Sequence, residues 1–332
     1  MNSSIIAGCF RNLFGQSPLL FRSPGRINLI GEHTDYNEGF VLPAAIDKAI
    51  ILAVAANNLP RCRVYAYDYE EAAEFSFTSL QHSEKGWANY IIGVLDQLRQ
   101  RGYELKGFDC VFGGDIPIGA GLSSSAALEC GIGHALSYLW ELALPKIEIV
   151  KLARQAENEF VGVKCGIMDQ FANTFGKAGH VIKLDCRSLD YSYYPCNPEG
   201  YQVVLLDTQV KHSLASSEYN TRRQECEKGV MVLNRHFPAV KSLRDCSEEM
   251  LEQVRGNLEP IVYQRCRYVI QEIARVEAAT HYLEAHQWPA FGAKMYETHQ
   301  GLKEDYEVSC PELDLLVDLA QSSGHVLGAR MM

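Results

Sequence analysis

Residues 119–128 read Gly-Ala-Gly-Leu-Ser-Ser-Ser-Ala-Ala-Leu, a glycine-rich loop followed by three hydroxyl side chains and then an apolar segment. Gly119 and Gly121 let the backbone bend where a Cβ would clash and bring its N–H groups close to an anion. The serines at 123–125 stand where a helix would begin, at the end that carries unpaired N–H groups and the positive end of the dipole. The stretch therefore predicts a cradle for phosphate groups.

Two other phosphate-binding loops do not match this stretch. A P-loop would continue with Gly-Lys-Ser/Thr, and the dinucleotide fingerprint would have a third glycine where a serine stands here. The plain alternative is a flexible turn that a serine caps before an ordinary helix. On these residues alone, that alternative stays open.

The composition limits the classes of protein to which the chain can belong. Its 332 residues are 47% hydrophobic and 22% charged, which is enough apolar material for two compact domains. The net charge of −10 disfavours nucleic acid as a partner. The longest apolar run, 46–56, is interrupted by Asp47 and Lys48, so it predicts a buried strand and not a membrane span.

The chain start and the cysteines indicate where the protein works. Residues 2–15 have apolar side chains at helical spacing and no basic region, so we expect an amphipathic helix and not a signal peptide. The 11 cysteines are odd in number and never spaced as Cys-x-x-Cys, which favours reduced, buried thiols. We expect a cytoplasmic monomer that binds neither membrane nor nucleic acid.

The apolar periodicity predicts strands and helices in both halves of the chain, and hence the α+β class. A composition shift near 186–200 predicts domains 1–190 and 191–332. Residues 40–56 and 62–77 are expected to be antiparallel strands joined by a turn at 57–60. The other expected strands begin at 22 or cover 108–112, 180–185, 191–194 and 202–206, and the expected helices cover 87–101, 124–142, a segment from 145, 168–175, 219–236, 247–254, 260–283 and 288–305.

A second polar motif, at residues 25–37, reads Gly-Arg-Ile-Asn-Leu-Ile-Gly-Glu-His-Thr-Asp-Tyr-Asn. Glu32, His33 and Asp35 lie in a stretch with too little apolar content to be core. Carboxylates and an imidazole so close together can form several directed hydrogen bonds, which suits a polyol such as a sugar. A metal site would need more ligands at defined spacing, and a solvated turn remains the plain alternative.

Glu157 and Asp169 form a third acidic pair. Glu157 lies at the edge of the buried face of the helix that Pro145 opens, and Asp169 follows a glycine break. A phosphoryl-transfer site needs a carboxylate for Mg²⁺ and an acidic group near the attacking hydroxyl. Taken singly, Asp169 is better explained as a helix cap and Glu157 as a surface residue.

The three motifs in this order resemble the GHMP family of small-molecule kinases and, within it, the galactokinases. Residues 25–37 are similar to the galactokinase signature almost letter for letter, and 117–128, 166–170 and 217–223 are similar to further family blocks. The resemblance runs from the first helix to the last residue. It implies a two-domain GHMP-kinase fold with an active-site cleft between the domains.

The resemblance also implies roles for individual residues. Asp169 would be the base, or the polarising group, for the hydroxyl on carbon 1, and Arg26 would stabilise the transferring phosphoryl group. Ser125 and Glu157 would hold Mg²⁺. The implied contacts to the sugar are Glu32, His33, Thr34, Asp35, Gly166, Asp169 and Tyr219, and those to ATP are Gly119, Ala120, Gly121, Leu122, Ser123, Ser124, Ser125 and, beside the adenine, Trp87.

The chain departs from the family at its end. Galactokinases carry a third glycine-rich motif directly after an Arg-Met pair, whereas this chain reaches Arg330-Met331 and stops at Met332. The resemblance therefore implies a C-terminally truncated chain without the closing strands. Unpaired sheet edges and uncovered apolar faces lead us to expect reduced stability.

The activity implied is ATP-dependent phosphorylation of galactose to galactose 1-phosphate. One rival is a non-catalytic regulator that senses galactose and ATP; such sensors lack a Ser-Ala pair that Ser125 and Ala126 supply here. A second rival is an N-acetylgalactosamine kinase, which needs room around carbon 2 of the sugar. A mevalonate-type kinase fits least, because an apolar substrate has no use for the polar side chains of 32–35.

Overall fold

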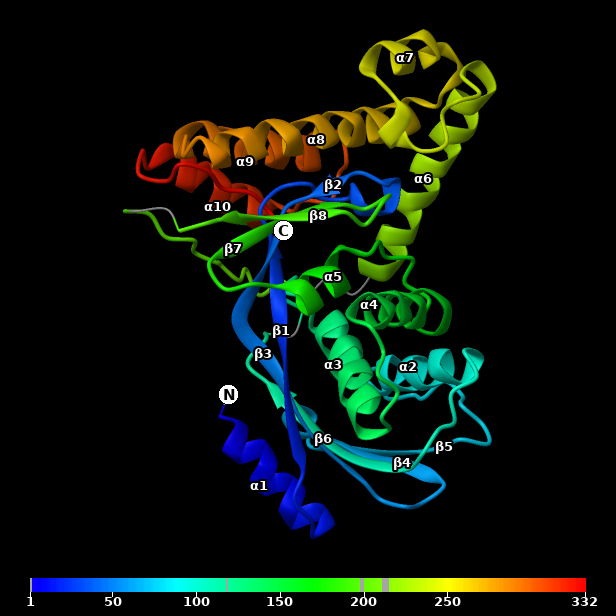
Figure 1. Cartoon of the computed structure of the whole chain (residues 1–332). Helices are drawn as coiled ribbons and strands as arrows, with labels where there is room; N and C mark the ends of the chain where they lie inside the picture. The colour runs from blue at the N-terminus through cyan, green and yellow to red at the C-terminus, as the bar shows by residue number, and fades with distance from the viewer. Residues whose placement is uncertain (1, 118, 198–199, 211–214) are drawn as a thin grey trace. The chain divides into compact units, whose positions relative to one another are not determined.

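The computed structural model describes residues 2–117, 119–197, 200–210 and 215–332 (Figure 1). Contacts divide the chain into two compact units: unit 1 comprises residues 1–26 and 45–175, and unit 2 comprises residues 27–44 and 176–332. The division differs from the expected boundary at 190/191. The chain leaves unit 1 at residue 27 and returns to it at residue 45. A single shift in composition marks one boundary and cannot reveal a unit made of two separate segments.

Unit 1 is built on a five-stranded sheet in the order β1-β3-β6-β4-β5. The central strand β6 pairs antiparallel with β3 and parallel with β4. The strands are β1 (Leu19–Asn28), β3 (Pro43–Ala56), β4 (Arg61–Ala66), β5 (Glu71–Ser76) and β6 (Phe108–Gly114). The strands β1 and β3 carry the chain out of unit 1 and back.

The expected pairing of 40–56 with 62–77 was wrong in two respects. β6, which comes later in the sequence, lies between β3 and β4, so these two strands share no ladder. The segment 62–77 is two strands, separated by a 3₁₀ turn at Tyr67–Tyr69, and these pair with each other. Alternation of apolar residues predicts a strand but carries no information about its neighbour in the sheet.

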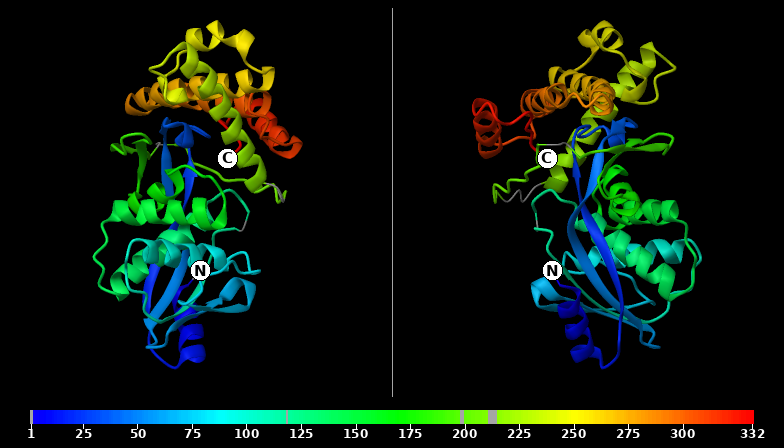
Figure 2. Two further views of the ribbon diagram at one scale, coloured as in Figure 1. Left: turned by 90° about the vertical axis from the view of Figure 1, so that its right-hand side faces the viewer. Right: turned by 60° about the vertical axis from the view of Figure 1, so that its left-hand side comes forward.

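Helices cover both faces of this sheet. α1 (Ser3–Phe14) packs Ile6 and Phe10 against Ile51 and Val111 on one face. On the other face, α3 comes so close that a Cβ on Gly131 would lie 2.7 Å from Leu52. Figures 1 and 2 show α1 apart from the other helices of unit 1, which are α2 (Ala88–Gln100), α3 (Ser124–Leu139), α4 (Lys146–Gln155) and α5 (Met168–Phe175).

Unit 2 combines a three-stranded sheet, in the order β2-β7-β8, with long helices. Figure 1 shows α8 and α9 running side by side. The core that includes Tyr268 and Tyr306 is built mainly by α8 with residues of α6 and α7. The strands are β2 (Phe40–Val41), β7 (His180–Asp185) and β8 (Tyr191–Pro195), and the helices are α6 (Ala215–His236), α7 (Glu248–Gln253), α8 (Pro260–Glu284), α9 (Trp288–Glu304) and α10 (Pro311–Ser322). The α+β class is confirmed.

The strand expected at 202–206 is not formed. Val203, Val204 and Leu206 are 56%, 70% and 64% exposed, and no strand among the described residues pairs with this segment. An apolar pattern becomes a strand only where a partner completes its hydrogen bonds. Within the described ranges, no helix is long and apolar enough to cross a membrane.

Candidate active site

Arg26 and Asp169 form the centre of the polar site in unit 1. Arg26 lies in β1, and Asp169 lies in the first turn of α5. The guanidinium donates through Nε to Asp169 Oδ1 at 2.7 Å and through Nη2 to Oδ2 at 2.9 Å. Ser123 Oγ adds a third hydrogen bond, 2.5 Å from Oδ2. Three donors therefore fix the direction of the carboxylate that the family resemblance assigned to the reacting hydroxyl.

The same arginine holds the glycine–serine loop. Its Nη1 donates to the carbonyl of Gly121 at 2.5 Å, and its backbone N–H donates to the carbonyl of Leu122 at 3.2 Å. The two segments are so close that a Cβ on Gly25 would lie 2.9 Å from that Leu122 oxygen. The loop predicted to cradle phosphate therefore begins beside the Arg26–Asp169 pair.

The loop has the backbone expected from its glycines. Gly119 and Gly121 have φ of 78° and 73°, the left-handed region that glycine enters without strain. Ser123 also has a positive φ, 57°, and α3 begins at Ser124, so the predicted loop-to-helix transition is confirmed. The Ser123 hydroxyl binds Asp169 and makes no capping bond in α3, a contact that its place in the motif could not indicate.

Glu157 and Ser125, the expected metal ligands, are hydrogen-bonded to each other. Glu157 is buried in a π-helical turn, Ala156–Val161, that follows α4, and not at the edge of a regular helix as expected. Burial and the charge of Asp169 raise the pKa of Glu157 to about 7, and the Ser125 hydrogen bond opposes that shift. A buried carboxylate and hydroxyl are the hard oxygen ligands that Mg²⁺ prefers, so these residues fit the ion.

Two further groups at this position were missed by the sequence reasoning. The side-chain amide of Gln170 donates to Glu157 Oε2 at 2.8 Å and lies 3.5 Å from Glu129 Oε2. Glu129 is fully buried in α3, and burial together with the charge of Glu157 raises its pKa well above the usual value. The feature of the sequence that could have indicated Glu129 is its position as a lone carboxylate within a largely apolar helix. Across the part of the chain that is described, no cluster of three His, Cys, Asp or Glu side chains could hold a metal.

In unit 2, residues 31–37 of the second polar motif form a tight turn lined by aromatic rings. His33 takes a positive φ of 62°, and its Nδ1 lies 2.9 Å from the hydroxyl of Tyr36. Its ring centroid is 5.4 Å from that of Tyr219 and 4.7 Å from that of Tyr306. Burial lowers the pKa of His33 to about 4, so at neutral pH the imidazole is uncharged and can donate one hydrogen bond and accept another.

The other members of the motif, Thr34 and Asp35, are both buried. The Thr34 hydroxyl is buried and lies within hydrogen-bond distance of the carbonyls of Gly31, at 2.9 Å, and Phe40, at 2.6 Å, so that its single proton can be donated to either and this side chain closes the turn. Asp35 begins a 3₁₀ turn, Asp35–Asn37, and its Oδ1 accepts the N–H of Tyr36 at 2.9 Å. Thr34 therefore has a structural role that its assignment to the sugar did not include.

The carboxylate of Glu32 is held by two side chains. Its Oε2 accepts hydrogen bonds from Arg330 at 2.8 Å and from Asn28 at 3.1 Å. Its side chain is 14% exposed, against 2% for Arg330. Arg330 was not predicted as a site residue, because it stands almost three hundred residues away in the sequence.

Comparison with known proteins decides the family. Residues 8–56 match the family model "Galactokinase galactose-binding signature" and residues 89–177 match "GHMP kinases N terminal domain". The chain is 42% identical to the galactokinase of Roseiflexus sp. (strain RS-1), over 97% of this chain and 82% of that protein. Thermotoga maritima galactokinase is also 42% identical, over 94% of this chain and 85% of that protein. The chain belongs to the galactokinase family.

Solved structures agree with membership of the galactokinase family. Lactococcus lactis galactokinase, solved with galactose, superposes with a TM-score of 0.94 at 34% identity, covering 98% of this chain and 86% of that one. The mevalonate kinase of Methanococcus jannaschii superposes with a TM-score of 0.59 at 18% identity, over 95% of this chain and 87% of that one, and so shares the fold. The predicted GHMP-kinase fold is confirmed.

Two of the residues that the galactokinase resemblance implied lie in well-packed surroundings in unit 1. Trp87 is buried against Phe112, and its indole Nε1 donates to Glu71 at 2.8 Å. Gly166 is buried in the segment that leads into α5. Their contacts to adenine and to the sugar stay predictions.

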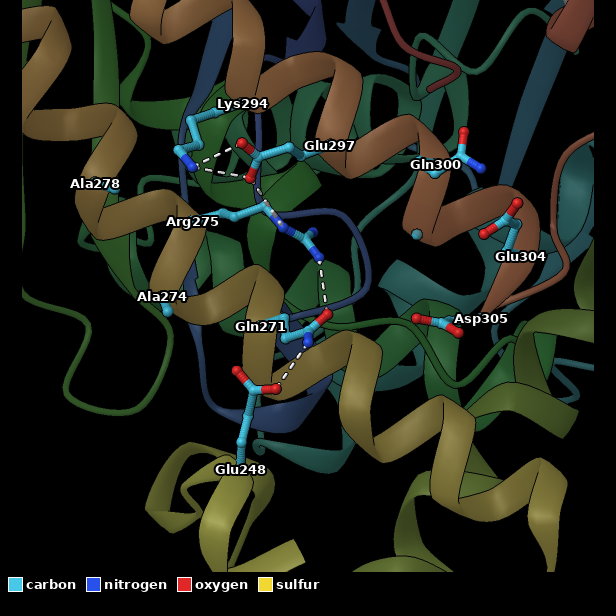
Figure 3. Close-up of a pocket in the computed structure, with 11 residues that line it drawn as sticks. Glu248, Gln271, Ala274, Arg275, Ala278, Lys294, Glu297, Gln300, Glu304 and Asp305 are labelled. Carbon is cyan, nitrogen blue, oxygen red and sulfur yellow. Dashed lines mark hydrogen bonds and ion pairs between the residues drawn. The ribbon is translucent and has the colours of Figure 1, made fainter. Parts of the chain in front are cut away.

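An open groove of about 550 Å³ lies elsewhere in this galactokinase-family chain, along α8 and α9 in unit 2 (Figure 3). Arg275 extends between the two helices, with the Lys294–Glu297 pair on one side and Gln271 on the other (Figure 3). No residue assigned to sugar, ATP or metal lines this groove. The groove is connected to the polar motif through Arg275, which also pairs with the buried Glu272, and Glu272 accepts the backbone N–H of Gly31.

Proposed function

We propose that this chain transfers the γ-phosphoryl group of ATP to the anomeric hydroxyl of galactose, giving galactose 1-phosphate and ADP. The observation that carries the proposal is the Asp169 carboxylate, held by Arg26 and Ser123 beside the glycine–serine loop. Membership of the galactokinase family and the match to its galactose-binding signature support the same reaction.

In this proposal, Asp169 orients the attacking hydroxyl and draws its proton, because its fixed lone pairs can accept a hydrogen bond from the sugar. The Arg26 guanidinium faces the charge that develops on the phosphoryl oxygens. The N–H groups of 119–125 and the start of α3 bind the ATP phosphates. Positioning and charge stabilisation supply most of the rate enhancement in such reactions.

Ser125 and Glu157 would hold the magnesium ion that accompanies ATP. When bound, Mg²⁺ neutralises charge on the phosphate oxygens. Gln170 keeps the Glu157 carboxylate in place through its 2.8 Å hydrogen bond. Because burial and Asp169 raise the pKa of Glu157 to about 7, a proton competes with the ion near neutral pH, and a bound cation would stabilise the ionised form.

The groups proposed to bind the sugar hydroxyls are Glu32, His33, Asp35 and Tyr219. The neutral imidazole and the ionised carboxylates offer both donors and acceptors, which an array of hydroxyls needs. We further propose that the protein acts as a cytoplasmic monomer. All 11 cysteines are free, which supports a reducing compartment.

The sugar preference follows from these hydrogen bonds. Galactose and glucose differ in the orientation of one hydroxyl, on carbon 4, so the wrong epimer leaves a buried acceptor without its donor, at a cost of roughly 1–3 kcal/mol. We expect a strong preference for galactose in kcat/KM and a loss of most of that preference in Glu32→Ala and Asp35→Ala.

The matched control is Glu38→Ala, since Glu38 directly follows the same turn but is exposed. It should retain the preference of the parent chain. Equal kcat/KM for the two epimers in the parent chain would refute the assignment of these residues to the sugar, and would reopen the sensor and N-acetylgalactosamine-kinase alternatives.

A further inference from the structure

The backbone of Glu32 is held on both sides by side chains from α8. The Oε1 atom of Glu272 accepts the N–H of Gly31 at 2.8 Å and that of Glu32 at 3.3 Å. The hydroxyl of Tyr268 donates to the carbonyl oxygen of Glu32 at 3.0 Å. The peptide groups on both sides of Glu32 are therefore fixed by residues that lie far along the sequence.

Glu272 is itself locked in place. It is fully buried, and a buried carboxylate is tolerated only where donors surround it. The hydroxyl of Thr298 donates to its Oε2 at 2.9 Å, and Arg275 forms an ion pair with the same oxygen. With the two backbone N–H groups of the turn, these contacts give the carboxylate a complete set of partners and leave it little freedom to move.

The side chain of Glu32 is held by Arg330. The Arg330 guanidinium is almost fully buried and donates to Glu32 Oε2 at 2.8 Å. Its other nitrogens donate to the carbonyls of Leu29, at 2.9 Å, and Met331, at 2.7 Å, and it also binds the carbonyl of Asn28. The planar fork is thus anchored on the main chain of β1 and of the segment that follows it, and one of its arms holds the carboxylate.

We propose that Arg330 is a positioning residue for sugar recognition: it sets the direction of the Glu32 carboxylate and so the discrimination between galactose and its epimers, while Glu272 and Tyr268 fix the backbone beneath. The inference rests on the proposed role of Glu32 as a sugar contact. A guanidinium is required because a lysine supplies a point charge without the fork that binds three backbone carbonyls and the carboxylate together. A displacement of about 1 Å in a binding group can cost about 10²-fold in rate.

The test is a double-mutant cycle with Arg330→Lys and Glu32→Gln in the full chain. We expect Arg330→Lys to lower kcat/KM for galactose about tenfold or more, to leave kcat/KM for glucose almost unchanged, and to leave the KM for ATP within about twofold. In the Glu32→Gln background, adding Arg330→Lys should change the galactose value by less than about threefold, because the two residues act through one contact.

The control is Arg255→Lys, since Arg255 pairs with Glu252 on the exposed surface of the same unit and should leave all three values unchanged. If Arg330 had only a structural role, Arg330→Lys would lower kcat/KM for galactose and raise the KM for ATP together. If Arg330→Lys does not fold, Arg330→Gln replaces it, because the shorter amide also breaks the fork, and the same loss of discrimination is expected.

Additive losses in the cycle, or an unchanged galactose-to-glucose ratio in the Arg330 variant, would overturn the inference while leaving the function of Glu32 intact. If Glu32→Gln alone leaves the ratio unchanged, the proposed sugar contact fails, and the inference fails with it. Strong coupling between the two substitutions, together with an unchanged KM for ATP, supports both the sugar contact of Glu32 and the positioning role of Arg330.

Discussion

Replacing Asp169 by Asn should lower kcat for galactose phosphorylation by about 10²–10⁴-fold, the usual contribution of a group that transfers or polarises a proton. Asparagine keeps the shape of the side chain but removes its charge and one of the two oxygens that Arg26 binds. The Kd of ATP should change little, because the phosphates are assigned to the loop at 119–125. Steady-state kinetics and calorimetric titration with ATP measure the two quantities.

Asp47→Asn is the matched control, since Asp47 lies exposed in β3 of the same unit. It should have the kcat of the parent chain. An Asp169→Asn variant that retains the parent kcat would rule out the role assigned to this carboxylate. A variant that loses ATP binding to the same degree would place Asp169 in the nucleotide site instead.

Removal of the Arg26 guanidinium should have an even larger effect. Arg26→Ala takes away the positive charge that faces the phosphoryl group, and arginines in that position contribute about 10³–10⁵-fold to kcat. It also leaves Asp169 without two of its hydrogen bonds and releases the carbonyl of Gly121. Arg26→Lys should recover only part of the activity, because an ammonium cannot bind both carboxylate oxygens and that carbonyl at once.

Arg22→Ala separates this effect from a general disturbance of the strand. Arg22 lies in the same strand β1 but is exposed, and its side chain binds a backbone carbonyl at Asp47. Its kcat should equal that of the parent chain. Full recovery of activity in Arg26→Lys would mean that charge alone matters and that the fork geometry seen here has no catalytic role.

The local parts of the site could be predicted from the sequence because their chemistry is contiguous. The glycines at 119 and 121 and the serines after them specify a bent backbone that enters a helix, whatever the surroundings. The same holds for the existence of the first helix, although apolar spacing did not fix its buried face: Ile6 and Phe10 are buried, whereas Ile5 and Leu13 are 46% and 49% exposed. In each case, a few neighbouring residues determine the local conformation.

Long-range contacts could not be predicted in this way. Neither the pairing of β6 between β3 and β4 nor the return of the chain to unit 1 at residue 45 leaves a local pattern. The partners of the assigned residues were missed for the same reason: Arg330 and Glu272 are hundreds of residues from Glu32 in the sequence. Thr34 was assigned to the sugar because it lies within the motif, whereas its hydroxyl satisfies backbone carbonyls.

The most direct test of the account is to follow the phosphorus atom in a reaction of the purified chain with galactose, ATP and Mg²⁺. We expect ADP and one sugar phosphate in equal amounts, with the ³¹P signal coupled to the proton on carbon 1 of galactose, and the same signal growing at least about 10²-fold more slowly with Asp169→Asn. Coupling to the protons on carbon 6, or release of inorganic phosphate alone, would contradict the account. So would the absence of transfer from a folded chain that binds both galactose and ATP.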